Sequence, residues 1–166
     1  MSYRTGRYLF PAALFLFCFF SARPAAAEEA VSGVFMKLPA FSASDRVLIL
    51  APHPDDEAIA CAGVIKEALR RGAFLKVAYL TNGDHNQLAF LVYKKRPVLR
   101  TGEFIQMGEV RRREAVKAMG SLGVPEKDLV FLGYPDFGTF SIFCKYWKSR
   151  KPYKSILTRI SAVPYK

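Results

Sequence analysis

Three short apolar runs, separated by two stretches with helical periodicity, are the feature that most constrains the fold of this chain. The runs cover Arg46–Ala51, Phe74–Thr81 and Leu129–Leu132. A continuous apolar run that ends at turn residues is typical of a strand buried on both faces of a sheet. We therefore expect three strands at these positions, with the first two buried on both faces.

The two intervening stretches have the spacing of amphipathic helices. In Glu57–Arg71 the apolar residues recur on one face, and Gly72 follows where the helix is expected to end. Glu109–Leu122 has the same pattern and is followed by Gly123 and Pro125. Strands that alternate with helices predict an α/β fold, here a Rossmann-like parallel sheet with flanking helices.

The first part of the chain is typical of a secretory signal peptide, which we place at residues 1–27. Arginines precede an apolar run over 8–20, and the small residues Ala25 and Ala27 fit a cleavage site. This predicts export to the periplasm or the extracellular space, with 28–45 as a linker. An uncleaved membrane anchor is the alternative, although a span needs about 20 apolar residues.

Composition excludes several classes of protein. The chain has 166 residues and only three cysteines, too few for a disulfide scaffold. Charged residues are common after the leader, which excludes a protein with several membrane spans. The 25 basic against 14 acidic residues give a net charge of +11, which favours an acidic partner without identifying it. Cys61 lies among small residues and is expected to be a buried thiol.

Polar residues follow each predicted strand. The segments are Pro52–Glu57, Asn82–His85 and Tyr134–Asp136; all three contain aspartate, and two contain the only histidines of the chain. Ligands of parallel α/β sheets bind outside the carboxyl ends of the strands. We therefore expect the functional site at this edge.

The run from His53 to Glu57 contains candidates for metal binding and proton transfer. His53 and Asp56 are spaced so that both can reach one divalent ion, a ligand set that suits zinc. Asp55 points elsewhere and is expected to be free to take a proton from water. The structural alternative is a group of acids in the first turn of a helix, next to a histidine without a ligand.

Other candidate site residues lie farther along the chain. Arg111 falls on the buried stripe of the second helix and can reach the site, or else it pairs with Glu114 or extends to water. Asp84 and Asp136 are expected to hold a substrate hydroxyl or to orient a ligand, unless each caps its own turn. His85 is expected to contact substrate or to belong to a loop.

Four stretches resemble, in order and spacing, the LmbE-like (PIG-L) family of zinc-dependent N-deacetylases. They are His53–Glu57, Thr81–Asp84, the helix from Arg111 to Gly123, and Phe131–Asp136. The resemblance covers Arg46–Asp136 and implies that this is the N-terminal part of a deacetylase domain.

The resemblance also implies residue roles and a substrate. His53 and Asp56 would bind Zn²⁺, Asp55 would be the general base and Arg111 would contact the substrate. The reaction would be metal-assisted hydrolysis that removes the acetyl group from an N-acetylated amino sugar or glycoconjugate.

The chain departs from the family pattern at one point. The family supplies a third zinc ligand from a downstream H-x-x-H segment, and this chain has no histidine after His85. We expect a domain truncated at the C-terminus, with weak zinc binding and no useful turnover. The alternative is a non-catalytic glycan- or lipid-binding member with a degenerate metal site. A nucleotide-binding domain lacks support because no G-x-G-x-x-G follows the first strand.

Residues 137–166 have a distinct composition, with seven bases, seven aromatic residues and no acid. We interpret them as a basic-aromatic insertion that packs against further parts of the domain. The alternative is contact with an anionic glycan or a membrane surface through residues 145–166. Nucleic acid is not expected as a partner of an exported protein.

Overall fold

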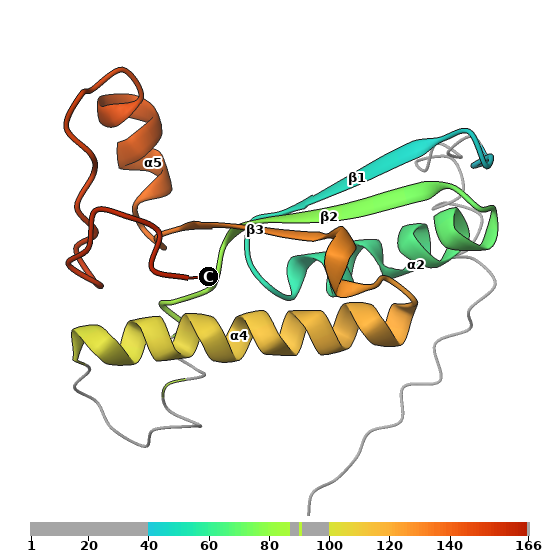
Figure 1. The fold of residues 1–166 in the computed structure, drawn as a ribbon, viewed down its shortest axis with the longest axis horizontal. Helices are drawn as coiled ribbons and strands as arrows, with labels where there is room; N and C mark the ends of the chain where they lie inside the picture. Colours follow the sequence, from blue (N-terminus) through green and yellow to red (C-terminus); the bar gives the residue numbers. More distant parts are fainter. Residues whose placement is uncertain (1–39, 87–89, 91–99, 166) are drawn as a thin grey trace, which may run out of the picture. The chain divides into compact units, whose positions relative to one another are not determined.

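The computed structural model describes residues 40–86, 90 and 100–165. The predicted signal peptide and most of the predicted linker therefore lie outside the described residues. The described part forms alternating strands and helices (Figure 1). In chain order these are β1 (Arg46–Ala51), α2 (Asp56–Arg70), β2 (Phe74–Thr81), α4 (Thr101–Leu122), a 3₁₀ turn (Glu126–Asp128), β3 (Leu129–Tyr134), α5 (Thr139–Ser141) and a π-helical turn (Ile142–Tyr146).

The three strands form one parallel sheet in the order β1-β2-β3. Arg46 pairs with Phe74 at one end of β1, and Ala51 pairs with Tyr79 at the other. The register between β2 and β3 is irregular near the carboxyl end, where Thr81 pairs with Tyr134. The predicted α/β fold, a parallel sheet flanked by helices, is confirmed.

The core lies between the sheet and the helices α2 and α4, which run along the same side of the strands (Figure 1). Each new strand is added at the same edge of the sheet, in the order β1-β2-β3. Because crossovers between parallel strands are right-handed, both connecting helices then lie on the same face. Tyr79 stacks on Phe131 at a ring separation of 4.5 Å and joins β2 to β3. The buried core residues are Ile49, Ala51, Ile65, Ala68, Ala73, Leu75, Val77, Tyr79, Ala115, Met119, Val124 and Leu129.

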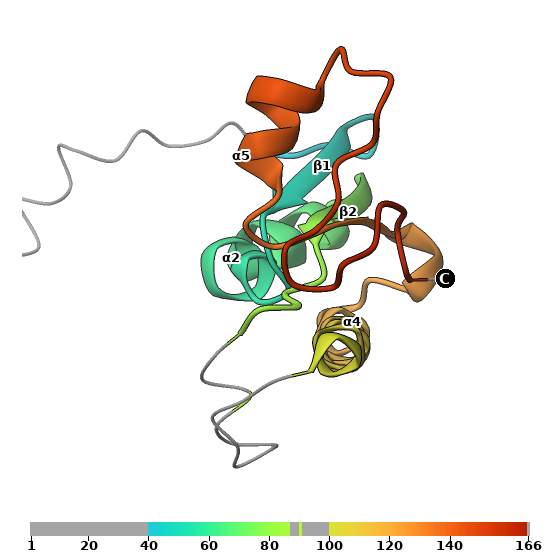
Figure 2. The same ribbon diagram turned by 90° about the vertical axis from the view of Figure 1, so that its left-hand side faces the viewer.

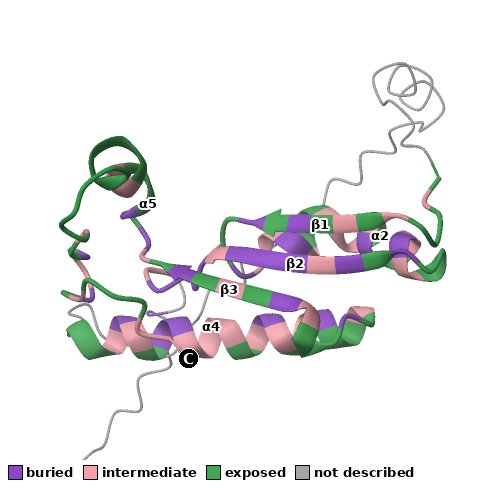
Figure 3. Ribbon diagram, turned by 45° about the horizontal axis from the view of Figure 1, so that its top comes forward, coloured by how far each residue is buried: buried purple, intermediate pink, exposed green. Residues whose placement is uncertain are grey.

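The opposite face of the sheet is largely open among the described residues, so the prediction that β1 is buried on both faces is wrong. Leu48 and Leu50 are more than half exposed, whereas Ile49 and Ala51 are buried (Figure 3). Val130 and Leu132 of β3 are also exposed. The continuous apolar run of β1 places apolar side chains on both faces of the sheet, but the described helices cover only one of these faces.

Helix α4 begins eight residues before the predicted start at Glu109. The backbone N–H of Arg100 donates to the Glu103 carboxylate at 2.7 Å, which satisfies a polar group at the start of the helix. Phe104 and Met107 then pack against Phe90 in a second, smaller core.

The bounds of β1 and β2 and the end of α4 agree with the prediction, and the remaining boundaries differ from it by one or two residues. Helix α2 begins at Asp56, and β3 continues past Gly133 to Tyr134. Gly123 adopts a left-handed φ of 94° and ends α4 as expected. Cys61 is only partly buried, contrary to the expectation of a buried thiol. Within residues 40–86 and 100–165, no helix has the length and apolar character needed to cross a bilayer.

Candidate functional site

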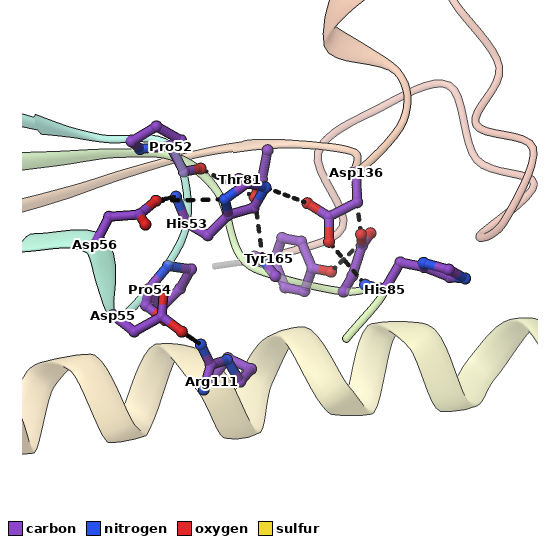
Figure 4. A network of polar contacts seen from close by, with 12 residues as sticks. Pro52, His53, Pro54, Asp55, Asp56, Thr81, His85, Arg111, Asp136 and Tyr165 are labelled. Carbon is purple, nitrogen blue, oxygen red and sulfur yellow. Dashed lines mark hydrogen bonds and ion pairs between the residues drawn. The ribbon is translucent and has the colours of Figure 1, made fainter. Parts of the chain in front are cut away.

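The three polar segments predicted to meet at the carboxyl edge of the sheet lie together in the structure (Figure 4). The backbone N–H and the hydroxyl of Thr81 both donate to the Pro52 carbonyl, at 3.1 and 3.2 Å, and join the ends of β1 and β2. The backbone N–H of His85 donates to Asp136 Oδ2 at 2.8 Å. These bonds connect all three strand ends.

His53 and Asp56 face each other across the turn that leads into α2. The backbone N–H of His53 donates to Asp56 Oδ2 at 2.9 Å, and His53 Nδ1 lies 3.4 Å from the same oxygen. Both side chains are substantially exposed. Asp56 also lies in the first turn of α2, where the helix dipole stabilises a carboxylate.

Asp55 occupies a strained position between these two residues. Its φ of 140° is rare for a non-glycine residue, and such strain persists only where surrounding contacts hold it. The backbone N–H of Asp55 donates to Glu57 Oε2 at 3.0 Å, and Glu57 is buried. The turn therefore points the Asp55 side chain away from His53 and Asp56 (Figure 4).

Arg111 reaches from α4 to this turn. Its Nη2 donates to Asp55 Oδ2 at 2.7 Å and also to the Pro54 carbonyl (Figure 4). Its Nη1 lies 3.5 Å from Glu114 Oε2, so the predicted pairing with Glu114 is present as well. Asp55 points away from His53 and Asp56 as expected, and its carboxylate forms an ion pair with Arg111; its role as a base stays a prediction. The expected approach of Arg111 to the site is observed.

Asp136 is buried at the end of β3 and directs one oxygen toward His53. Its Oδ2 accepts the His85 N–H, while its Oδ1 is buried without a hydrogen-bond partner among the described residues. This Oδ1 lies 3.9 Å from His53 Nε2, on the opposite side of the imidazole ring from Asp56. The carboxylates of Asp136 and Asp56 thus flank the imidazole ring of His53.

Asp84 lies behind Asp136. It is 1% exposed, its Oδ1 accepts the Asp136 N–H at 3.0 Å, and its Oδ2 accepts the Tyr165 hydroxyl at 3.3 Å. Burial, with the nearby Asp136 carboxylate as a second cause, raises the pKa of Asp84 to about 7. The pKa of Tyr165 is also raised, first by burial and then by Asp84. Both contacts reach distant segments rather than the turn of Asp84 itself, so they differ from the structural alternative, and the substrate-binding role of Asp84 stays a prediction.

The cleft at this edge has a volume of about 760 Å³. Asp84 instead borders a separate cavity of about 240 Å³ beside β3. The residues that line the cleft are His53, Asp55, Gly83, His85, Asn86, Arg111, Asp136, Phe137, Thr139 and Phe140.

Sequence reasoning missed the aromatic wall of the cleft. The His85 ring packs edge-on against Phe137 at 4.7 Å and stacks on Phe104 at 5.9 Å. Phe137 has a left-handed φ of 59°, an outlier for a bulky residue. The position of Phe137 directly after Asp136 could have indicated that it lies at the site. The sequence gives no such indication for Tyr165, which is 81 positions from its partner Asp84.

The residues present fit part of a metal site. His53 Nδ1 and Asp56 Oδ2 form a nitrogen–oxygen pair of the kind that binds zinc. Within the described part of the chain, no three histidine, cysteine, aspartate or glutamate side chains are grouped closely enough to enclose an ion.

Fold and site together define a parallel α/β domain with a histidine–carboxylate cleft at its strand ends. The chain belongs to the PIG-L family, described as GlcNAc-PI de-N-acetylase, whose model matches residues 48–163. The resemblance seen in the sequence is thus confirmed, and the match continues beyond Asp136.

Two curated relatives match over 90 residues at 33% identity, covering 54% of this chain. Both are 1D-myo-inositol 2-acetamido-2-deoxy-alpha-D-glucopyranoside deacetylases, from Mycobacterium sp. strains KMS and JLS. The match spans 28% of the length of each relative, little more than a quarter.

Two solved structures are also similar. The N,N'-diacetylchitobiose deacetylase of Pyrococcus horikoshii is 25% identical, with a TM-score of 0.45 over 66% of this chain and 39% of that one. GalB, the 4-carboxy-2-hydroxymuconate hydratase of Pseudomonas putida KT2440, is 22% identical, with a TM-score of 0.46 over 56% of this chain and 35% of that one.

Proposed function

We propose that this chain carries the metal-binding and proton-transferring residues of an exported hydrolase that removes the acetyl group from an N-acetylated amino sugar or glycoconjugate. One observation carries the proposal: the His53–Asp56 pair and the Asp55–Arg111 pair adjoin the same cleft. Membership of the PIG-L family and the acetamido-sugar deacetylases among its relatives support the same reaction.

His53 and Asp56 are the residues that would hold the metal ion. Their facing atoms are 3.4 Å apart, close enough to share one ion, and the donor set suits Zn²⁺. Zinc bound there would supply Lewis-acid polarisation of the acetamide carbonyl and of water. The described residues provide two protein ligands, which leave the coordination incomplete, so we expect the 166-residue chain to bind zinc weakly.

Asp55 would act as the general base. Its carboxylate lines the cleft, where it can take a proton from the water that attacks the acetamide carbon. The same carboxyl group can return a proton to the departing amine nitrogen. Arg111 fixes the base through its bond to Oδ2 and contributes positive charge beside the reacting carbonyl.

Asp136 would position His53. A carboxylate that accepts one ring N–H of a ligating histidine leaves the other nitrogen with a lone pair for the metal. Asp136 Oδ1 lies 3.9 Å from Nε2, so a small side-chain rotation completes this bond and leaves Nδ1 beside Asp56. Because Asp136 also lines the cleft, its carboxylate would also contact a substrate hydroxyl.

Zinc titration of the 166-residue chain by calorimetry tests the metal site. His53→Ala and Asp56→Asn should each weaken zinc binding at least tenfold, since each removes a ligand. The matched control is His85→Ala, which changes the only other histidine and should keep the affinity within threefold. Equal affinity in the wild type and His53→Ala would contradict the assignment.

Deacetylation is followed as primary amine released from N-acetylglucosamine and from its inositol-linked and chitobiose forms. It is measured with the 166-residue chain and with the longest form of the protein that its host expresses. Amine release that requires zinc and Asp55 supports the proposal. Rapid turnover that persists in both Asp55→Asn and His53→Ala would overturn it.

A binding-only member is the second candidate. It is favoured by one observation: the described residues provide two metal ligands rather than three. Retained affinity for the acetylated sugar, together with no amine release in any form of the protein, would select it.

A further inference from the structure

Four large aromatic side chains stand exposed around α5 and the π-helical turn. Phe137, Phe140, Phe143 and Trp147 are 66%, 75%, 71% and 69% exposed. We call these four residues the aromatic patch. Views from two directions show that α5 projects from the carboxyl end of the sheet, away from α4 (Figures 1 and 2), and most of this segment is exposed (Figure 3). A soluble surface seldom leaves so many aromatic rings together in water.

The patch lies within a stretch of uniform positive charge. Residues 137–166 contain seven bases and no acid, and those next to the patch include Lys145, Lys148 and Lys151. These three lysines are exposed. None of the ion pairs found among the described residues involves a base of this stretch. The positive charge therefore faces outward beside the aromatic rings.

The aromatic patch is continuous with the cleft. Phe137 and Phe140 line the cleft together with His53 and Asp136, and Phe143 and Trp147 follow them in and directly after the π-helical turn. The Phe143 and Trp147 rings contact each other at 5.9 Å. A surface that engages the patch would therefore lie at the entrance of the cleft.

The chemistry of the patch differs from that of the open face of the sheet. The exposed side chains of that face include the aliphatic residues Leu48, Leu50, Val130 and Leu132, which is the composition of a surface covered by protein. The patch instead combines phenylalanine and tryptophan with lysine. Tryptophan and phenylalanine side chains insert at the interfacial layer of a bilayer, and lysines are attracted to anionic headgroups.

We propose that the aromatic patch and its neighbouring lysines bind the surface of a membrane that contains anionic lipids. The aromatic rings enter the interfacial layer and the lysines contact the headgroups, so the entrance of the cleft faces the lipid surface. This inference goes beyond the proposed function because it assigns a partner surface whose binding requires neither zinc nor turnover.

The fluorescence of Trp147 provides a direct test, because it is the only tryptophan in the chain. The full chain is mixed with vesicles of phosphatidylcholine alone or with 30% phosphatidylserine, about the anionic content needed for a strong surface potential. We expect a blue shift only with the anionic vesicles, weakened at least tenfold in apparent affinity between low and high salt. The readout reports on this segment rather than on the apolar run near the N-terminus.

Two matched pairs of charge reversals test whether vesicle binding depends on the lysines beside the aromatic patch or only on the net charge of the protein. Lys148→Glu with Lys151→Glu should abolish the shift, whereas Lys66→Glu with Lys117→Glu makes the same charge change at exposed positions of α2 and α4 and should keep it. Phe143→Ser, at an exposed position where folding is little affected, should weaken the shift several-fold.

Three results would overturn the proposal. They are unchanged Trp147 emission on anionic vesicles, an equal shift on phosphatidylcholine alone, and an equal loss in both charge-reversal pairs. A shift with soluble dextran sulfate but none with vesicles would also overturn it, in favour of an anionic glycan. None of these results bears on deacetylation, which is measured separately as released amine.

Discussion

Arg111 of α4 connects to Asp55 of the β1–α2 turn through a 2.7 Å bond between Nη2 and Oδ2. The same Nη2 also donates to the Pro54 carbonyl. Because Asp55 has a φ of 140°, this arginine stabilises a backbone conformation that costs energy. His53 and Asp56 belong to the same turn (Figure 4). Arg111, which is 56 positions after Asp55 in the sequence, therefore connects α4 to the candidate metal site.

Replacement of Arg111 by alanine should lower the free energy of unfolding by about 1–2 kcal/mol. The variant loses the bonds to Asp55 and Pro54, although the partial exposure of Asp55 reduces the effect. Urea unfolding followed by circular dichroism measures the change. Arg113→Ala is the matched control, since Arg113 is exposed on the same helix and should change stability by less than about 0.5 kcal/mol. Similar losses in both variants would show that the contact at Asp55 contributes little.

Asp55→Asn should separate proton transfer from metal binding. The amide keeps an oxygen that can accept from Arg111 but cannot act as a base, so we expect turnover to fall by about 10²-fold or more. Zinc affinity should stay within threefold, because His53 and Asp56 are unchanged. Amine release and calorimetry measure the two properties on the same sample. A large loss of zinc affinity would instead make Asp55 part of the metal site.

Much of the fold could be predicted because its signals are local. The first two strands were predicted at their observed bounds, since continuous apolar runs end at turn residues on both sides. The start of α4 was missed because Gly102 and Gly108 weaken the helical pattern there. The first turns of α4 pack against Phe90, which lies outside this helix; the rings of Phe90 and Phe104 are 5.4 Å apart. Such a contact leaves no periodic signal.

The candidate site was predictable only in part, because only some of its residues are close together in the sequence. His53, Asp55 and Asp56 lie within one short run, so spacing alone placed them at the strand end. The bond between Asp55 and Arg111 joins residues 56 positions apart and depends on how α4 lies across the turn. The Tyr165–Asp84 contact depends on the path of the last thirty residues, for which the sequence has no regular pattern.

Asp84 should make stability depend on pH in a defined window. Its pKa is raised to about 7 in the folded protein and is about 4 in an unfolded chain. Between these values the folded state binds a proton that the unfolded state has released, so the free energy of unfolding falls as pH rises from 4 to 7 and levels off above 7. The slope contributed by one proton is at most about 1.4 kcal/mol per pH unit.

Asp84→Asn should flatten this dependence, because the amide does not titrate and can still accept the Asp136 N–H. Chemical denaturation at several pH values between 4 and 8, with a chelator present, measures the slope. Asp128→Asn makes the same chemical change at a partly exposed carboxylate near Lys76 and should leave the slope at its wild-type value. An unchanged slope in Asp84→Asn would place the responsible proton elsewhere.

Two glycines of α4 should respond oppositely to the same substitution. Glycine within a helix costs about 0.5–1 kcal/mol relative to alanine, so Gly120→Ala should stabilise the protein by about this amount, because no atom lies within 4 Å of the new Cβ. At Gly108 the new Cβ would lie 2.3 Å from the Tyr165 hydroxyl oxygen, which also donates to Asp84. Tyr165 must then move and the buried Asp84 loses a partner, so Gly108→Ala should destabilise by about 1–3 kcal/mol despite its better helix propensity. Thermal unfolding of both variants measures the two signs, and stabilisation by both would mean that Tyr165 does not pack against α4 in solution.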